Sequence, residues 1–312
     1  MESINQIQFK KDDFEPIPKS ERDAEKIVRP SLTYWEDVWR RLKENKIAMV
    51  SMFFLILTLI AVFILPHFYP YAYDAQDLAN TNQAPTAEHI FGTDSHGRDL
   101  FIRVIYGTRI SLVVGIVASI INLTIGVVYG GISGYSGGIV DNIMMRIVDI
   151  LSTIPLTLYV ILLMVWMPEG KGMKSILIAI GTIYWIGMAR IVRGQIFSLK
   201  EQEYVMAARV LGASDMRILF KHLIPNSMGP IIVSMTMSIP SAIFTEAFLS
   251  FIGLGISAPQ ASLGSLCNDV LSKFSIYPHL LFFPALALCL IILAFNFLGD
   301  GLRDALDPKM RK

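Results

Sequence analysis

The chain has 312 residues, a formal net charge of +1 and a charged fraction of 17%. Soluble domains carry about 25% charged residues. A hydrophobic fraction of 53% and a mean hydropathy of +0.52 therefore indicate an integral membrane protein. The near-neutral charge argues against nucleic acid as a partner. The two cysteines are too few for a disulfide framework.

Residues 1–45 form a polar segment that we expect to be a cytoplasmic tail. Its first part, up to Pro30, mixes charges and prolines without periodicity, which favours an extended arm. From Ser31 the pattern becomes helical, with one face made of Trp35, Val38, Trp39 and Leu42. A tryptophan-bearing face opposite a basic face suits the membrane interface, so we predict an interfacial helix in contact with lipid.

The rest of the chain, residues 46–312, predicts an all-α integral membrane protein. A helix needs about 20 apolar residues to cross the bilayer core. Six segments meet this requirement, with an outer loop at about 66–109 between the first two. The segments are roughly 47–65, 110–130, 142–166, 175–193, 228–253 and 280–299.

Lysine and arginine set the orientation of such spans, because cytoplasmic loops carry more of them. If the first span leaves the cytoplasm, fifteen basic residues fall on the cytoplasmic side and six on the other. The outer six are Arg98, Arg103, Arg109, Lys171, Lys174 and Lys273. We therefore predict that both termini, and the loop at about 195–227 between spans four and five, are cytoplasmic.

That cytoplasmic loop contains a structured polar stretch, residues 203–225. The pattern predicts a short helix, a turn at Gly212, and a second short helix that Pro225 stops. Small residues would let the first helix lie close to a partner, surrounded by basic residues. These are Ala207, Ala208 and Gly212, with Arg209, Arg217 and Lys221. We favour docking to another subunit over an interfacial helix without a partner.

No catalytic motif accompanies this stretch. The sequence lacks GxxxxGK[ST], HExxH, CxxC and GxSxG, so we expect no enzyme and no nucleotide site of that type. His89, Asp94, His96 and Asp99 could be proposed as a metal site or an enzyme site. The stretch GTDSHGRD is more typical of a tight turn, with Asp99 and Arg103 as partners four residues apart in the following helix.

Glu246 is the notable ionisable residue within a predicted span. A carboxylate there is costly unless it meets a partner, water or a subunit interface. It could line a pathway or an interface, or form a structural hydrogen bond, and the sequence leaves both open. Near the start of the third span, Arg146 and Asp149 are placed to pair on one face, close to Asp141.

Residues 203–226, EYVMAARVLGASDMRILFKHLIPN, resemble the EAA loop of ABC-importer membrane subunits. Ala207, Ala208, Gly212 and Pro225 fall at the motif's positions. Met206 stands where the family has glutamate, so a salt bridge from that glutamate does not carry over. The terminal Ile-x-Leu-Pro is replaced by His-Leu-Ile-Pro.

The resemblance extends along nearly the whole chain. FGTDSHGRDLFIRVIYGTRISL, GGISGYSGGIVDNIMMRIVDILSTIP, FTEAFLSFIGLGI and LGDGLRDALDP are similar to the C-type membrane subunit of dipeptide and oligopeptide importers. RPSLTYWEDVWRRLKENKIA is most like the oligopeptide branch.

This resemblance implies a permease of the bacterial cell membrane that imports peptide and hydrolyses no ATP itself. Its partners would be a homologous second permease, two ATP-binding subunits that hold ATP and Mg²⁺, and an extracellular peptide-binding protein. The implied contacts with the ATPase come from Glu203, Tyr204, Ala207, Ala208, Arg209, Gly212 and Pro225. The alternative is a secondary transporter driven by an ion gradient, with Glu246 as the coupling acid.

Overall fold

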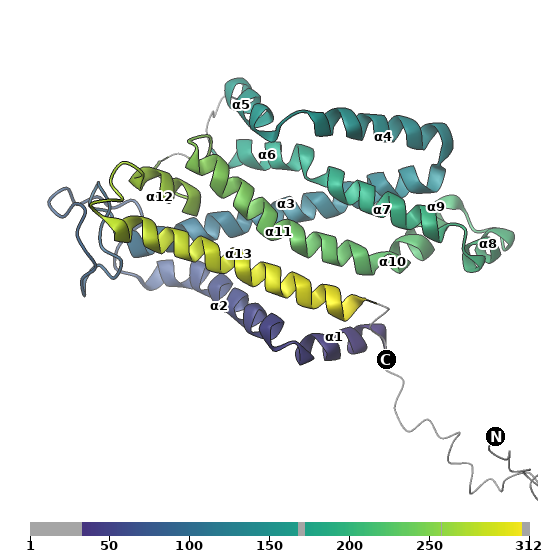
Figure 1. The fold of residues 1–312 in the computed structure, drawn as a ribbon, viewed down its shortest axis with the longest axis horizontal. Helices are drawn as coiled ribbons and strands as arrows, with labels where there is room; N and C mark the ends of the chain where they lie inside the picture. The colour runs from purple at the N-terminus through teal and green to yellow at the C-terminus, as the bar shows by residue number, and fades with distance from the viewer. Residues whose placement is uncertain (1–32, 168–171, 257, 308–312) are drawn as a thin grey trace, which may run out of the picture. The chain divides into compact units, whose positions relative to one another are not determined.

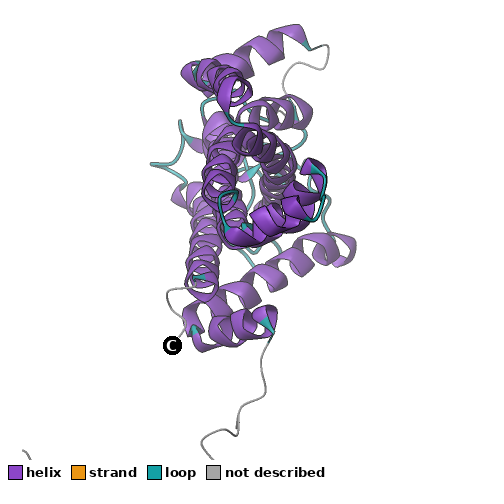
Figure 2. Cartoon of the chain, turned by 90° about the vertical axis from the view of Figure 1, so that its right-hand side faces the viewer, coloured by secondary structure: helices purple, strands orange, loops and turns teal. Residues whose placement is uncertain are grey.

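The computed structural model describes residues 33–167, 172–256 and 258–307, and within these ranges it contains helices and loops but no strand (Figure 2). The predicted all-α class is confirmed. The chain divides into two units, Met1–Asp37 and Val38–Lys312. Helix α1, Tyr34–Glu44, begins in the first unit and ends in the second. The predicted arm up to Pro30 lies outside the described residues.

Within the described part of the chain, five helical segments are long and apolar enough to cross a membrane (Figure 1). They are α2 (Lys46–Phe68), α3 (Leu100–Ser136), α6 with α7 (Met173–Ile183 and Trp185–Leu199), α11 (Met228–Phe251) and α13 (Pro278–Leu306). They run between an end that carries the loop Tyr69–Asp99, called here the loop end, and an end that carries α8 (Glu203–Val210), called the α8 end.

The third predicted span is a broken one. The sequence predicts one helix over residues 142–166, whereas the structure has α4 (Gly138–Thr153) and α5 (Leu156–Trp166), bent by 82° relative to each other. Pro155 lacks an N–H and disfavours helical backbone in the residue before it, and Ile154 is extended, with φ −84° and ψ 122°. The expectation of a continuous helix is therefore wrong, and a sixth span exists only if the bent pair is counted as one.

Helix α3 begins earlier than the predicted span. Asp99 caps it, because its carboxylate accepts a hydrogen bond from the backbone N–H of Ile102 at 3.0 Å. The non-helical part of the expected loop at 66–109 is consequently Tyr69–Asp99, and the basic residues Arg103 and Arg109 lie inside α3.

Among the described helices, α3 and α7 share the most extensive contact. Gly126, Gly130 and Gly134 form one buried stripe along α3, and a methyl group added to any of them would overlap α7. At Gly130 the obstructing atoms belong to the backbone of Ala189. Small residues at this spacing let membrane helices pack backbone against backbone. The stripe therefore fixes α7 against the centre of the bundle.

The predicted stop at Pro225 is wrong. After α9 (Asp215–Ile218) the chain stays helical through a π segment (Leu219–Leu223) and α10 (Ile224–Asn226) into α11. A proline inside an α-helix clashes with the carbonyl four residues earlier and donates no hydrogen bond. The wider π turn before Pro225 relieves both problems. This continuity makes one helical rod from Asp215 to the far end of α11, with a single turn at Ser227.

Candidate functional site

Helix α8 is held against the bundle by one face. Val205 is fully buried in an apolar cluster formed mainly by α7, the π segment and the start of α11, and Ala208 packs against the same cluster. The buried members are Met188, Val192, Ile196, Val205, Ile218, Leu219, Leu223 and Ile231. Because residues three apart share a helix face, Val205 and Ala208 define the inward face of α8.

The opposite face of α8 is exposed and apolar. Val210 and Leu211 are 88% and 87% exposed, and Met206 on α8 and Met216 on α9 are exposed as well. We call these four residues the α8 surface. Large apolar side chains presented at the tip of the molecule indicate an interaction site rather than a solvated loop.

A compact turn joins α8 to α9. Gly212 has φ +80°, a region that side-chain-bearing residues rarely adopt. The N–H of Ala213 donates to the carbonyl of Ala208 and that of Gly212 to Arg209, both at 3.0 Å, which is the Schellman arrangement. Ser214 then caps α9, as its hydroxyl accepts from the N–H of Arg217 at 3.4 Å. The predicted helix, glycine turn and second helix are confirmed.

Polar contacts tie this element to α3. The hydroxyl of Tyr135 donates to the carboxylate of Asp215 at 2.6 Å. Arg209 also bonds to Tyr135, and this hydrogen bond raises the pKa of the guanidinium above its usual value. Tyr204 bonds to Asn226, while partial burial raises the pKa of its phenol. The α8 surface is therefore carried by a fixed body, which can transmit a displacement to α3 and α11.

Behind this body, ion pairs join α7 to α4. The guanidinium of Arg193 contacts both carboxylate oxygens of Asp141 at 2.5 Å, and Ser133 donates to the same carboxylate at 2.5 Å. Arg190 bonds to Asp149 at 3.1 Å. The predicted Arg146–Asp149 pair is present at 3.9 Å, but Arg190 is the nearer partner.

The residues that the sequence singled out here lie on different faces. Glu203, Ala207 and Gly212 are exposed, Tyr204 is at the edge, and Ala208 faces inward. Arg209 is turned towards Tyr135 and Pro225 lies in the helix below. The sequence identified residues 204–211 as the docking helix but did not single out Val210 and Leu211 as its exposed apolar side chains. Their exposure follows once Val205 and Ala208 are known to face inward, because Val210 then lies on the other side of the helix.

Glu246 is fully buried between α3, α11 and α12 (Leu263–Val270). Its carboxylate accepts hydrogen bonds from the hydroxyls of Ser111 at 2.8 Å and Ser250 at 2.7 Å, and also bonds to Ser262. Ser262 caps α12. Glu246 thus links three helices near the loop end, and its role in transport stays a prediction.

The hydroxyl partners of Glu246 predict how it tolerates replacement. Hydroxyls can both donate and accept, so the amide of Glu246→Gln can keep the same contacts. We expect Glu246→Gln to take up substrate within about fivefold of wild type, since roughly one hydrogen bond of about 1 kcal/mol is at stake. Glu246→Leu should lower the melting temperature, because it strands buried hydroxyls. Loss of uptake in the glutamine variant, with its melting temperature unchanged, would show that a charge is required.

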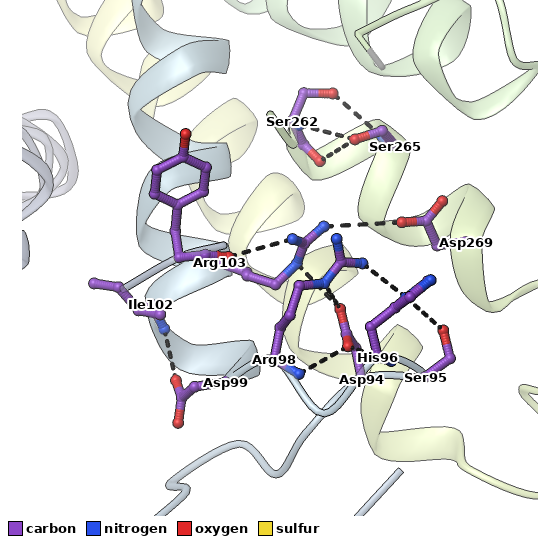
Figure 3. A network of polar contacts seen from close by, with 11 residues as sticks. Asp94, Ser95, His96, Arg98, Asp99, Ile102, Arg103, Ser262, Ser265 and Asp269 are labelled. Carbon is purple, nitrogen blue, oxygen red and sulfur yellow. Dashed lines mark hydrogen bonds and ion pairs between the residues drawn. The ribbon is translucent and has the colours of Figure 1, made fainter. Parts of the chain in front are cut away.

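At the loop end, the predicted turn is built from carboxylates that bind arginines (Figure 3). Asp94 accepts from the backbone N–H of His96 at 2.8 Å and from Arg98 Nε at 2.6 Å, and lies 3.4 Å from Arg103 Nε. Burial raises the pKa of Asp269 on α12, and the positive charge of Arg103 opposes this. The arginines thus hold the turn against α12.

The expected pairing of Asp99 with Arg103 is wrong. Asp99 uses its carboxylate to cap α3 and to contact His89 Nδ1 at 2.8 Å and Tyr69 at 3.2 Å. Arg103 instead reaches Asp94 and Asp269. The cap orients Asp99 towards the helix start, away from the next turn. No group of three potential metal ligands is present in the described ranges.

Treatment with the chelator EDTA distinguishes a turn held by ion pairs from a metal site. We expect EDTA to leave the melting temperature unchanged, whereas Asp94→Ala lowers it, because unpairing a buried arginine costs about 3 kcal/mol. Asp74→Ala, in the same loop but exposed, is the control and should melt like wild type. A drop in melting temperature with EDTA that added divalent metal reverses would contradict this account.

Comparison with known proteins identifies the family to which this chain belongs. A family described as "Binding-protein-dependent transport system inner membrane component" matches residues 126–312, which include α8 and the glycine turn. The chain belongs to this family. It is therefore a multi-pass permease of the inner membrane. A second family, the N-terminal TM domain of oligopeptide transport permease C, matches residues 33–85.

Individual relatives agree with the family. The chain is 50% identical over 299 residues to the oligopeptide transport system permease protein OppC of Bacillus subtilis, covering 96% of this chain and 97% of that one. It is 51% identical over 292 residues to the dipeptide transport system permease protein DppC of the same organism, covering 93% and 91%. An inward-facing structure of the MetNI methionine ABC transporter shares the fold, with a TM-score of 0.56 at 18% identity, covering 67% and 98%.

Proposed function

We propose that this permease is the membrane-spanning subunit of an ATP-driven peptide importer, and that it receives force through the α8 surface. Its partners in this proposal are a second permease, two ATP-binding subunits and an extracellular peptide-binding protein. The substrate class follows from the OppC and DppC relatives, whose names specify oligopeptide and dipeptide transport. ATP and Mg²⁺ belong to the ATP-binding subunits.

The observation that carries this proposal is the exposed apolar face of α8. Val210 and Leu211 lie at the tip of a fixed body, at the end opposite the arginine-bound turn. The positive-inside count supports a cytoplasmic location for that end. An apolar helix face surrounded by Glu203, Arg217 and Lys221 fits a hydrophobic groove with a charged rim on an ATPase subunit.

Movement at α8 has a direct route into the membrane. The Val205 cluster joins α8 to α7 and α11, and Tyr135 joins the turn to α3. When ATP draws two ATPase subunits together, α8 and these helices would move as one body and reverse the access of the pathway. A flexible loop could not transmit such a displacement.

Energy dependence tests the proposal. The complete complex in proteoliposomes should accumulate radiolabelled tetra-alanine only with ATP, and accumulation should persist when a protonophore collapses the proton gradient. A transporter coupled to ions gives the opposite pattern, namely uptake without ATP that the protonophore abolishes. That result would overturn the proposed function.

A further inference from the structure

A groove separate from the α8 surface lies in the α8 half of the bundle. It has a volume of about 650 Å³ and is lined by α3, Tyr184, α7, α11 and the end of α13. Ligand pockets in proteins span about 300–1,000 Å³. Most of its wall is apolar, including Met188 and Val233, with serine hydroxyls along α11 and the ionisable Arg303 and Asp307 at the end of α13.

At the wall of this groove, Asn122 on α3 carries an unused hydrogen-bonding group. The residue is 3% exposed, and its Oδ1 has no hydrogen-bond partner among the described residues. An unpaired buried amide costs about 1–3 kcal/mol, so it usually has a functional reason. Rotation of the amide by half a turn exchanges its donor and acceptor ends. Asn122 can therefore offer either end to a ligand.

The neighbouring hydroxyls add acceptors of the same kind. Ser238 donates to the carbonyl of Met235 at 2.7 Å and also contacts the hydroxyl of Ser119 at 3.1 Å, and Ser241 donates to the carbonyl of Met237 at 3.1 Å. With their protons committed to the helix backbone, both hydroxyls keep lone pairs for other donors. These acceptors suit an occupant with N–H or O–H groups spaced along an apolar body.

We propose that this groove binds the main chain of the translocated peptide, with Asn122 pairing to a peptide amide. An extended peptide has free N–H groups, whereas a transmembrane helix of a partner has bonded its own and lipid chains have none. Hydrogen bonds to the peptide main chain do not depend on the identity of the peptide's side chains. Because such contacts are weak, a substrate can leave the groove as readily as it enters. The inference rests on the proposed peptide transport.

Photocrosslinking tests the occupant directly. In the complete importer, a benzophenone amino acid at Val233 should form an adduct with radiolabelled tetra-alanine during ATP turnover. The same probe at Leu293, which faces a different apolar surface on α13, should form none. Uptake with adducts at Val233 only to lipid or to the second permease overturns the groove assignment alone. Absence of ATP-driven uptake overturns the proposed function as well.

Substitution of Asn122 supplies an independent test. Asn122→Leu should lower tetra-alanine uptake about tenfold, the effect of losing one or two hydrogen bonds. Its melting temperature should not fall, because an unpaired buried amide has been removed. Thr124→Val is the control, since that hydroxyl bonds only within its own helix, to Ile120 at 2.8 Å and Ile121 at 3.2 Å. Wild-type uptake by Asn122→Leu, or lower uptake with a lower melting temperature, overturns the proposal.

Discussion

Replacing Gly212 by leucine is expected to abolish uptake while the chain still inserts and folds. Gly212 lies between α8 and α9 with φ +80°, and a side chain added there would meet no atom within 4 Å. The strain of a non-glycine residue in this conformation is about 1–2 kcal/mol. That cost is tolerable for the fold. The leucine side chain would instead project beside Leu211, where the ATPase subunit is proposed to dock.

The control for this variant separates backbone strain from lost docking. Gly253 also has φ +80° and open space, but it lies at the loop end of the molecule. Gly253→Leu should therefore keep substrate-stimulated ATPase activity within about fivefold, consistent with strain of about 1 kcal/mol alone. Gly212→Leu should lose at least about 100-fold, since rigid coupling is all or none. Normal ATPase stimulation and uptake in Gly212→Leu would refute the docking claim.

Replacing Gly130 by leucine is expected to prevent assembly of the bundle. Its added side chain would have to displace the backbone of Ala189 on α7. Overpacking a core costs about 1–3 kcal/mol when side chains can yield, and a helix backbone yields less. Separation of α3 from α7 would also loosen the Val205 cluster that holds α8. We expect at least about a tenfold drop in the folded protein recovered from membranes, because an overpacking cost of this size shifts the folding equilibrium by about that factor.

Gly194→Leu is the matched control for Gly130→Leu. Gly194 lies on α7, the helix against which Gly130 of α3 packs, but it is exposed and nothing lies near its missing side chain. The Gly194→Leu variant should yield as much folded protein as wild type. Size-exclusion chromatography of detergent extracts measures the folded protein recovered for both glycine variants. Equal recovery of both variants would contradict close packing of α3 on α7.

Local signals in the sequence were sufficient for the element that carries the proposed function. Gly212 predicted a turn between two short helices, and this turn occurs because it depends on only a few neighbouring residues. The inward side of α8 needs more information, since Val205 is buried only because α7 and α11 come together there. For the same reason the local sequence does not reveal that Arg209, which we expect at the docking contact, also bonds to Tyr135, 74 positions earlier in the chain.

Two prolines show a second limit on what the sequence alone can predict. Pro155 lies inside an apolar run, and hydropathy alone treats that run as one span, although the backbone bends by 82° there. Pro225 was expected to end a helix, yet a π segment lets the helix continue. Which outcome occurs depends on whether the surrounding packing favours a wider turn or a break, and this is not encoded within a few residues.

The most direct test of the central claim is to ask what Leu211 touches. A benzophenone amino acid at Leu211 in the purified complex should, on illumination, give one adduct with the mass of this permease plus an ATP-binding subunit. The same probe at Phe68, which is exposed where α2 ends at the loop end of the bundle, should give no such adduct. An ATPase adduct at Leu211 would support docking through the α8 surface. Adducts only with lipid or detergent at Leu211, in a complex that still hydrolyses ATP on addition of substrate, would contradict it.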